Sequence, residues 1–151
     1  FCWMVVPCFA KTDAAVEAIL SSAEMFFKAM KAKDYQKIWG LLTARSKMTI
    51  VDDTYKDIMK SENSARRTKE QISDDFSKGG IIAKAYWDAF LDNFDPDWVL
   101  EQSKWDMGRI ERNRAEISLL YKKSEKPAML KMFIEDNAWK TGLVETFWTR
   151  K

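Results

Sequence analysis

The chain has 151 residues, of which 46% are hydrophobic and 32% are charged. This composition is typical of a folded globular domain and excludes extended disorder, and the length suits a single domain. The 25 basic and 23 acidic residues leave a net charge of +2 and are interleaved, so we expect no basic stripe for binding nucleic acid.

Several kinds of catalytic chemistry are excluded by residue type. The sequence contains no histidine, and both cysteines, Cys2 and Cys8, lie in its first eight residues. Zinc sites and His-activated serine or cysteine nucleophiles are therefore not expected. Asp92, Asp95 and Asp97 are spaced as calcium ligands could be, but a proline interrupts them and the glycine and final glutamate of an EF-hand are missing. We interpret them as a helix end and a turn, and expect no metal and no cofactor.

The first ten residues form an apolar run that ends at a polar segment. The run is too short to cross a bilayer, so we expect no transmembrane span. Positions 8–10 (Cys-Phe-Ala) resemble a small-x-small cleavage site, which predicts a signal-peptide remnant over 1–10, a single domain over 11–151 and a periplasmic or secreted protein. Two alternatives are a buried N-terminal strand or helix staple, and a lipoprotein acylated at Cys8, which Pro7 disfavours.

Helical spacing of hydrophobic residues dominates the chain up to Pro96. It predicts a long helix from Asp13, a short helix over 35–42 and another over 81–94. Between them, the β-branched run at 48–51 predicts a short strand. Residues 54–78 are dense in charge, which predicts one or two solvated helices that pack lightly.

After Pro96 the period changes to two. Alternation predicts strands centred on 104–110, 115–121, 128–135 and 139–148, joined by hairpin-length turns, with Gly142 as a mid-strand bulge. The predicted fold class is α+β, in which N-terminal helices pack on a strongly curved antiparallel sheet of four C-terminal strands plus the short strand at 48–51.

Two segments carry a family resemblance. Residues 26–42 (FFKAMKAKDYQKIWGLL) and 137–144 (NAWKTGLV) resemble the opening helices and the last strand of the nuclear transport factor 2-like superfamily. The resemblance covers about residues 13–53 and 98–149. It implies a cone, in which a curved sheet closes on helices around an interior pocket. Members include ketosteroid isomerase and dehydratases as well as binding and accessory domains, so the fold does not fix the function.

The resemblance also suggests where a catalytic site would lie. In the isomerase-like members, a carboxylate at the end of the first strand is the general base, and this position matches Asp52. Their oxyanion tyrosine matches Phe26 or Phe27, which have no donor, and the dehydratase Asp–His pair is impossible without histidine. We therefore expect a non-catalytic binding or accessory domain. The alternative is a small isomerase or lyase with Asp52 as base and Tyr35 or Tyr86 as acid. The interpretation that we favour for Asp52 and Asp53 is that they are turn or cap residues at the end of a strand.

Aromatic residues are the remaining signal, with seven Trp, nine Phe and four Tyr. We predict that some of them line a pocket for a small apolar ligand, and the alternative is that all of them are core. The predicted ligand-binding residues are Tyr35, Trp39, Tyr86, Trp105 and Trp139.

The second face of the predicted strands is also unusually apolar, although the outer face of such a sheet is normally polar. Its apolar residues are Leu120, Met129, Phe133, Val144 and Trp148. This pattern predicts a homodimer that pairs through the sheet face, and the alternative is that a helix of the middle segment covers that face.

Overall fold

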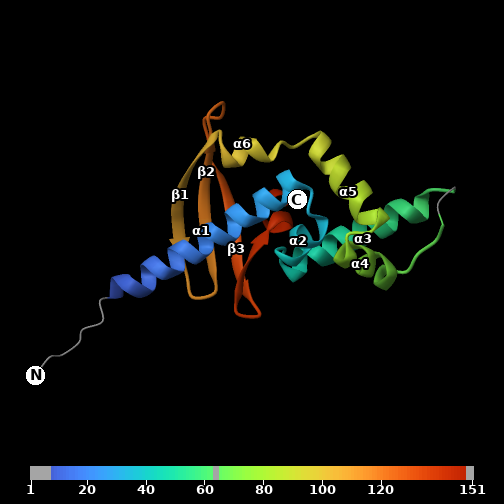
Figure 1. Ribbon diagram of the computed structural model, residues 1–151, viewed down its shortest axis with the longest axis horizontal. Coiled ribbons are helices and arrows are strands. Elements are labelled where there is room, and N and C mark those ends of the chain that lie inside the picture. The colour runs from blue at the N-terminus through green and yellow to red at the C-terminus, as the bar shows by residue number, and fades with distance from the viewer. Residues whose placement is uncertain (1–7, 63–64, 149–151) are drawn as a thin grey trace, which may run out of the picture.

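The computed structural model describes residues 8–62 and 65–148, with side chains from residue 13 onward. Helices make up the first two thirds and a four-stranded sheet most of the remainder (Figure 1), which confirms the predicted α+β class. The helices are α1 (Cys8–Ala32), α2 (Tyr35–Gly40), α3 (Ala44–Lys60), α4 (Lys69–Lys78), α5 (Ile81–Asp92), α6 (Pro96–Leu100) and α7 (Leu143–Phe147). The strands are β1 (Ser103–Ile110), β2 (Arg114–Tyr121), β3 (Ala128–Glu135) and β4 (Ala138–Gly142).

Helix α1 runs across one face of the sheet, and helices α2 to α5 lie together beyond the C-terminal end of α1 (Figure 1). The buried residues of α1, which include Ile19, Phe26 and Met30, recur at helical spacing, so they form one apolar stripe that faces the strands. Lys33 adopts a left-handed conformation with φ 56°, which ends α1. Asp34 then caps α2, since its carboxylate accepts a hydrogen bond from the Lys37 amide at 3.2 Å.

The predicted strand at 48–51 is wrong, because these residues lie inside α3. The hydroxyl of Thr43 caps this helix by accepting a hydrogen bond from the Ser46 amide at 3.1 Å. Ile50 and Val51 are both buried although they are adjacent, which a helix allows and a one-sided strand does not. The β preference of four residues is a weak signal, and tertiary packing overrides it here.

Two helices occupy most of the charged stretch 54–78, as predicted, but the light packing is wrong for α4. Ile72 and Phe76 of α4 are fully buried. Thr68 and Gln71 form a reciprocal capping box at its start, and Gly79, with φ 66°, ends it. This helix is therefore part of the core, although most of its residues are polar.

The sheet has the order β1-β2-β3-β4, and every neighbouring pair is antiparallel. In its register Met107 lies opposite Ile117, which lies opposite Leu130. Ile117 and Leu130 are fully buried on the face that carries α1, here called the inner face. Asp136 and Asn137 have φ values of 53° and 62°, which makes their link between β3 and β4 a tight hairpin turn, as predicted.

The predicted last strand ends early, and α7 follows it. Gly142 is not a mid-strand bulge but the last residue of β4 and the cap of α7. A Cβ atom at Gly142 would lie 3.0 Å from the Lys131 carbonyl oxygen and 3.0 Å from the Phe133 ring, so the close approach of β3 favours glycine. Val144, which we predicted on the outer face of a strand, is instead buried in α7.

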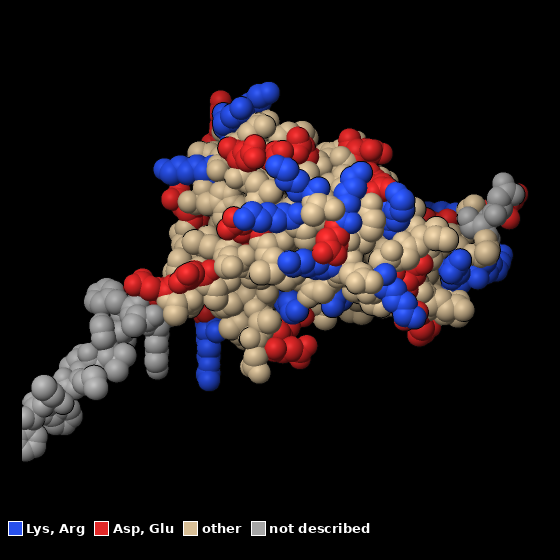
Figure 2. Space-filling view, in the orientation of Figure 1, with Lys and Arg blue, Asp and Glu red and all other residues tan. Residues whose placement is uncertain are grey.

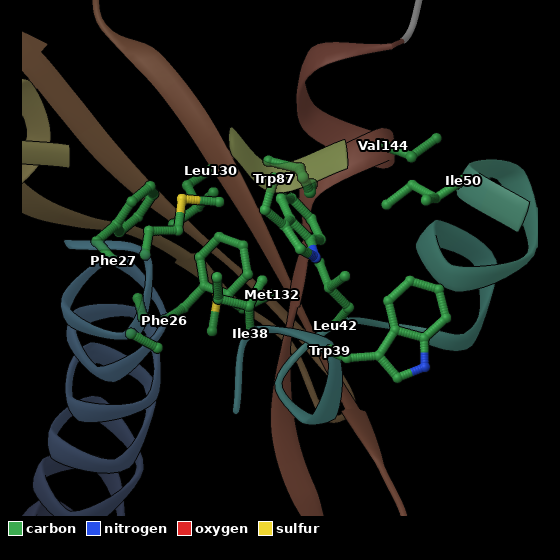
Figure 3. Packing of buried hydrophobic residues seen from close by; sticks show 14 of the residues in the cluster. Phe26, Phe27, Ile38, Trp39, Leu42, Ile50, Trp87, Leu130, Met132 and Val144 are labelled. Carbon is green, nitrogen blue, oxygen red and sulfur yellow. The ribbon is translucent and has the colours of Figure 1, made fainter. Parts of the chain in front are cut away.

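One hydrophobic core joins the helices to the sheet (Figure 3). Phe26 and Phe27 of α1 lie on one side of the fully buried Trp87, and Trp39 and Ile50 lie on the other. Each of these side chains contributes on the order of 1.5–3 kcal/mol by leaving water. The core thus includes side chains of both the helices and the sheet.

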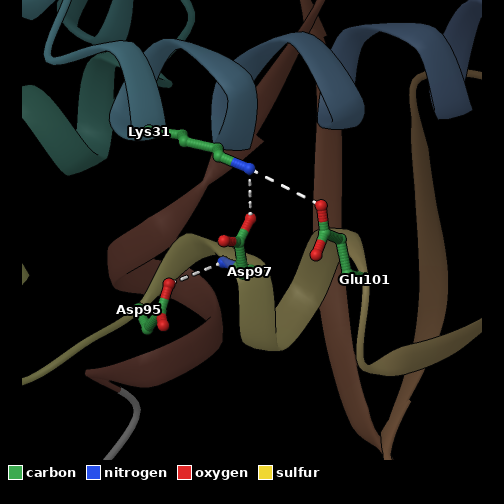
Figure 4. A network of polar contacts seen from close by, with 4 residues as sticks. All are labelled: Lys31, Asp95, Asp97 and Glu101. Atoms are coloured by element: carbon green, nitrogen blue, oxygen red, sulfur yellow. Dashed lines mark hydrogen bonds and ion pairs between the residues drawn. The ribbon is translucent and has the colours of Figure 1, made fainter.

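Helix α6 is attached to α1 by an exposed ion-pair network (Figure 4). Asp95 caps α6, since its carboxylate accepts a hydrogen bond from the Asp97 amide at 2.9 Å. The Lys31 ammonium lies 2.8 Å from the Asp97 carboxylate and 3.6 Å from that of Glu101. The hydrogen bond to Asp97 raises the pKa of Lys31. Asp92 ends α5, as predicted, but Asp95 and Asp97 belong to the start of α6, a helix that the sequence did not predict, rather than to a turn.

Candidate functional site on the outer face of the sheet

Three of the five predicted ligand-binding aromatics lie among the helices. Trp39 is buried and stacks on Phe76 with ring centroids 4.5 Å apart, and Tyr86 meets Phe76 edge-on at 5.4 Å. The Tyr35 hydroxyl donates a hydrogen bond to Asp88 at 2.5 Å, and this bond raises the pKa of Tyr35. These contacts join helices to one another.

The other two aromatics lie on the sheet. The indole nitrogen of Trp105 donates to the Val99 carbonyl at 2.7 Å, and its ring contacts Phe27 edge-on with centroids 6.3 Å apart. Trp139 is half-buried against the core, and its carbonyl accepts a hydrogen bond from the Ser22 hydroxyl at 2.6 Å. The five aromatics therefore do not line one common pocket, and their contacts fit the core alternative.

Asp52 lies on the surface of α3. Its carboxylate pairs with the Lys69 ammonium at 3.1 Å, and its side chain is 39% exposed. A general base needs a carboxylate that faces a pocket shielded from water. Asp52 instead has the surroundings of a surface ion pair.

A cleft of about 350 Å³ opens on the outer face of the sheet, beside α7 and the first turn of α3. Strands β1 to β3 form its floor because their outward residues point away from α1. The cleft is lined by Arg45, Arg109, Glu111, Arg114, Ala115, Glu116, Lys131, Phe133, Val144, Glu145 and Trp148.

Four basic and three acidic side chains line this sheet-face cleft. Glu111 lies 2.6 Å from the Arg114 guanidinium and 3.8 Å from that of Arg109, and its hydrogen bond to Arg114 lowers the pKa of Glu111. Arg45 and Lys131 have no ion-pair partner within residues 13–62 and 65–148. Arg45 and Lys131 are thus two cations that are free to meet an anion in the cleft. Elsewhere, basic and acidic side chains are interspersed over the face seen in Figure 2.

Glu145 lines the cleft and is only 8% exposed. Its two carboxylate oxygens accept hydrogen bonds from the Thr43 and Ser46 hydroxyls, each at 2.7 Å. The Ser46 oxygen in turn accepts a bond from the Val144 amide at 3.1 Å. The positive end of α3 also favours a carboxylate here. Glu145 therefore joins α7 to the start of α3.

Two aromatic side chains provide an apolar wall for the cleft. Phe133 is half-buried on β3, and Trp148, directly after α7, is 37% exposed. The sequence analysis missed Arg45 and Glu145 as site residues, because the strands predicted at 48–51 and 139–148 stood in place of the helices α3 and α7. It also missed Lys131, which lies on the predicted strand β3, because only the packing of α3 and α7 beside this strand makes it part of a cleft. Thr43 is of a residue type favoured as a helix N-cap, and its place just before the apolar run is a signal that would have indicated the start of α3.

Comparisons with family models, with curated proteins and with solved structures found no match. The resemblance to the nuclear transport factor 2-like superfamily therefore stays a prediction. In the part of the chain that the structure describes, no helix combines the length and the apolar character needed to cross a membrane. The same residues contain no group of three or more potential metal ligands.

Proposed function

We propose that this chain is a non-catalytic binding domain whose sheet-face cleft takes a small molecule with an anionic group and an apolar body. The observation that supports it is the combination of Arg45 and Lys131, which lack ion-pair partners in the described residues, with Phe133 and Trp148 in one hollow. A guanidinium and an ammonium recognise a carboxylate, sulfate or phosphate, and the two rings accept flat apolar groups.

The size of the cleft agrees with this ligand class. Its volume of about 350 Å³ lies at the lower end of the range of about 300–1,000 Å³ that is usual for small-molecule sites. Charge-assisted hydrogen bonds contribute about 1.5–3 kcal/mol each, so the two cations would account for most of the preference for an anion.

The enzyme alternative would use Glu145, because this is the shielded carboxylate that the cleft offers. Both of its oxygens are engaged by hydroxyl donors. Among the residues that the structure describes, no tyrosine or cysteine lines the cleft to act as a partner acid. Binding without catalysis is therefore the function that we favour.

The binding test uses 2-naphthoate and its neutral carboxamide as probes, with titration followed by calorimetry. We expect 2-naphthoate to bind at least tenfold more tightly than the amide, and Arg45→Ala or Lys131→Ala to weaken it about tenfold to a hundredfold. Lys104→Ala is the matched control, because Lys104 is an exposed residue of β1 that does not line the cleft. Equal binding of the two probes, or an equal effect of Lys104→Ala, would refute the proposal.

We also propose that the domain is exported and cleaved after Ala10. The proposed cleavage point falls within the first turn of α1, and residues 1–7 lie outside the described residues. N-terminal sequencing of native protein is expected to start at Lys11. Material from the cytosol that retains residue 1 would show the opposite.

A homodimer through the outer sheet face is a further part of the proposal. Leu120 is half-buried on this face and Met129 is 36% exposed, which offers apolar contact surface beside the cleft. Light scattering after size exclusion should give twice the monomer mass, and Met129→Lys should return the monomer. A monomeric wild-type protein at high concentration would contradict this part alone.

A further inference from the structure

A second apolar surface lies between α3 and α5, away from the strands that form the sheet-face cleft. This α3–α5 groove has a volume of about 640 Å³ and is lined by Thr54, Asp57, Ile58, Ile81, Ile82, Ala85, Tyr86, Ala89 and Phe90. Ile81 is 82% exposed at one end of the groove, which is unusual for a large aliphatic side chain. An exposed apolar surface of this extent commonly marks an interaction site.

The groove continues toward α7 through Phe90. A neighbouring hollow of about 620 Å³ is lined by Phe90, Asn93, Phe94, Phe147 and Trp148, so Phe90 belongs to both. The rings of Phe90 and Trp148 are nearly parallel, with centroids 6.5 Å apart. Together the two hollows form an apolar track along α5.

The shape of this track suits a helix. Ala85 and Ala89 lie one turn apart on α5, and both are exposed. Small side chains at this spacing let a second helix approach to the lower end of the usual interaxial distance of about 8–10 Å. The 12 residues of α5 extend over about 18 Å, which matches three turns of a partner helix.

The charges around the track are negative. Asp53 and Asp57 are exposed one turn apart on α3, and Asp92 continues the α5 stripe of Ala85 and Ala89. None of the three has an ion-pair partner among the described side chains, and neither hollow is lined by lysine or arginine. Burial, together with Asp53 and Asp57, raises the pKa of Tyr86 to about 12, which places both carboxylates near this lining residue.

We propose that the α3–α5 groove binds an amphipathic helix of a partner protein, one that presents an apolar stripe flanked by lysine or arginine. Apolar contact along the track provides the binding energy, and the aspartates select the charge of the partner. The acidic rim disfavours an anionic membrane surface. The cleft prefers anions and the groove prefers cations, so the two sites are distinguishable by charge.

The test uses a labelled synthetic helix of about 18 residues, with leucine at positions i, i+3, i+4 and i+7 and lysine beside them. A companion peptide carries glutamate in place of every lysine. By fluorescence anisotropy with the full chain, we expect the lysine peptide to bind at least tenfold more tightly than its companion, and the preference to shrink in high salt.

Two variants locate the site. Ala85→Gln with Ala89→Gln should weaken the lysine peptide at least tenfold, because the added side chains hold the helices apart while remaining favourable in an exposed helix. Asp53→Lys with Asp57→Lys should reverse the charge preference. Glu70→Lys with Asp74→Lys, on the exposed side of α4, is the matched charge control and should change neither peptide.

Four results with the peptides and variants would overturn the proposal, and a fifth would come from lipid vesicles. They are the absence of lysine-peptide binding at millimolar concentration, equal binding of the two peptides, an equal effect of the α4 control, and a homodimer that the alanine-to-glutamine variant dissociates. The last result would assign the groove to a second copy of the chain. Vesicles containing anionic lipid are a separate arm, and binding to them through the same residues would assign the groove to a membrane instead.

Discussion

The hydrogen bonds of Glu145 should make a measurable contribution to stability. Ser46→Ala removes the hydroxyl that donates to one Glu145 oxygen at 2.7 Å and that accepts from the Val144 amide at 3.1 Å. Glu145→Gln removes the charge but keeps the shape and leaves one carbonyl oxygen as acceptor. Both changes act where α7 meets the start of α3, and Ser46 is fully buried there.

The magnitude follows from the bonds that each change removes. A hydrogen bond to a charged group contributes about 1.5–3 kcal/mol, and an unsatisfied buried group costs about 1–3 kcal/mol. Ser46→Ala should therefore lower the free energy of unfolding by about 2–4 kcal/mol, and Glu145→Gln by about 1–3 kcal/mol. Because the two residues share one bond, the double variant should be less destabilised than the sum, with a coupling of about 1–2 kcal/mol.

Urea denaturation followed by tryptophan fluorescence measures all four proteins of this double-mutant cycle. Ser21→Ala on α1 is the control, because Ser21 is exposed and has no contact with Glu145, and it should change stability by less than about 0.5 kcal/mol. Strict additivity of Ser46→Ala and Glu145→Gln would refute the reasoning, since it would mean that the two side chains are not bonded in solution.

Two further predictions concern the core and the end of the sheet. The raised pKa of Tyr86, about 12, means that the folded state holds the phenol proton more tightly than the unfolded state, so its contribution is complete below pH 10 and is lost as the pH rises toward 12. Urea titrations at both ends of this window should show wild type losing about 2–3 kcal/mol more than Tyr86→Phe, and parallel losses would contradict the pKa. Gly142→Ala should lower the stability by about 1–3 kcal/mol, because its Cβ would meet the Lys131 carbonyl and the Phe133 ring at 3.0 Å. Gly40→Ala, with nothing within 4 Å of its Cβ, is the control, and equal midpoints of thermal unfolding for these two variants would exclude the clash.

The sequence could predict those parts of the fold that depend on neighbours along the chain. The change of hydrophobic period after Pro96 separates α1 to α5 from the four strands, although the short helices α6 and α7 also lie beyond it, and Asp136 with Asn137 sets the last hairpin turn. Both signals are local, because helix and strand repeats differ within one or two turns and a two-residue turn has its own backbone requirements. The α+β class follows from them.

The errors lie where a short apolar run fits either structure. Residues 48–51 have β-branched side chains, yet the cap at Thr43 and the burial of Ile50 and Val51 make them helical. Gly142 ends β4 because Lys131 and Phe133 of the neighbouring strand lie against it. The cap at Thr43 is a local signal, but the burial of Ile50 and Val51 and the close approach of β3 to Gly142 depend on residues far apart in the sequence.

Phe133, Val144 and Trp148, which the sequence analysis placed on the outer face, line the candidate site, but its charged residues came together only through tertiary structure. Arg45 begins α3, Lys131 lies on β3 and Trp148 follows α7, and only the packing of α7 beside the sheet brings the three to one cleft. The five predicted aromatics pack against the hydrophobic core, and none of them lines the sheet-face cleft, although Tyr86 also lines the α3–α5 groove. Local pattern thus determined most of the helices and strands, whereas long-range packing decided the ambiguous segments at 48–51 and 143–148 and which side chains remain free to bind a ligand.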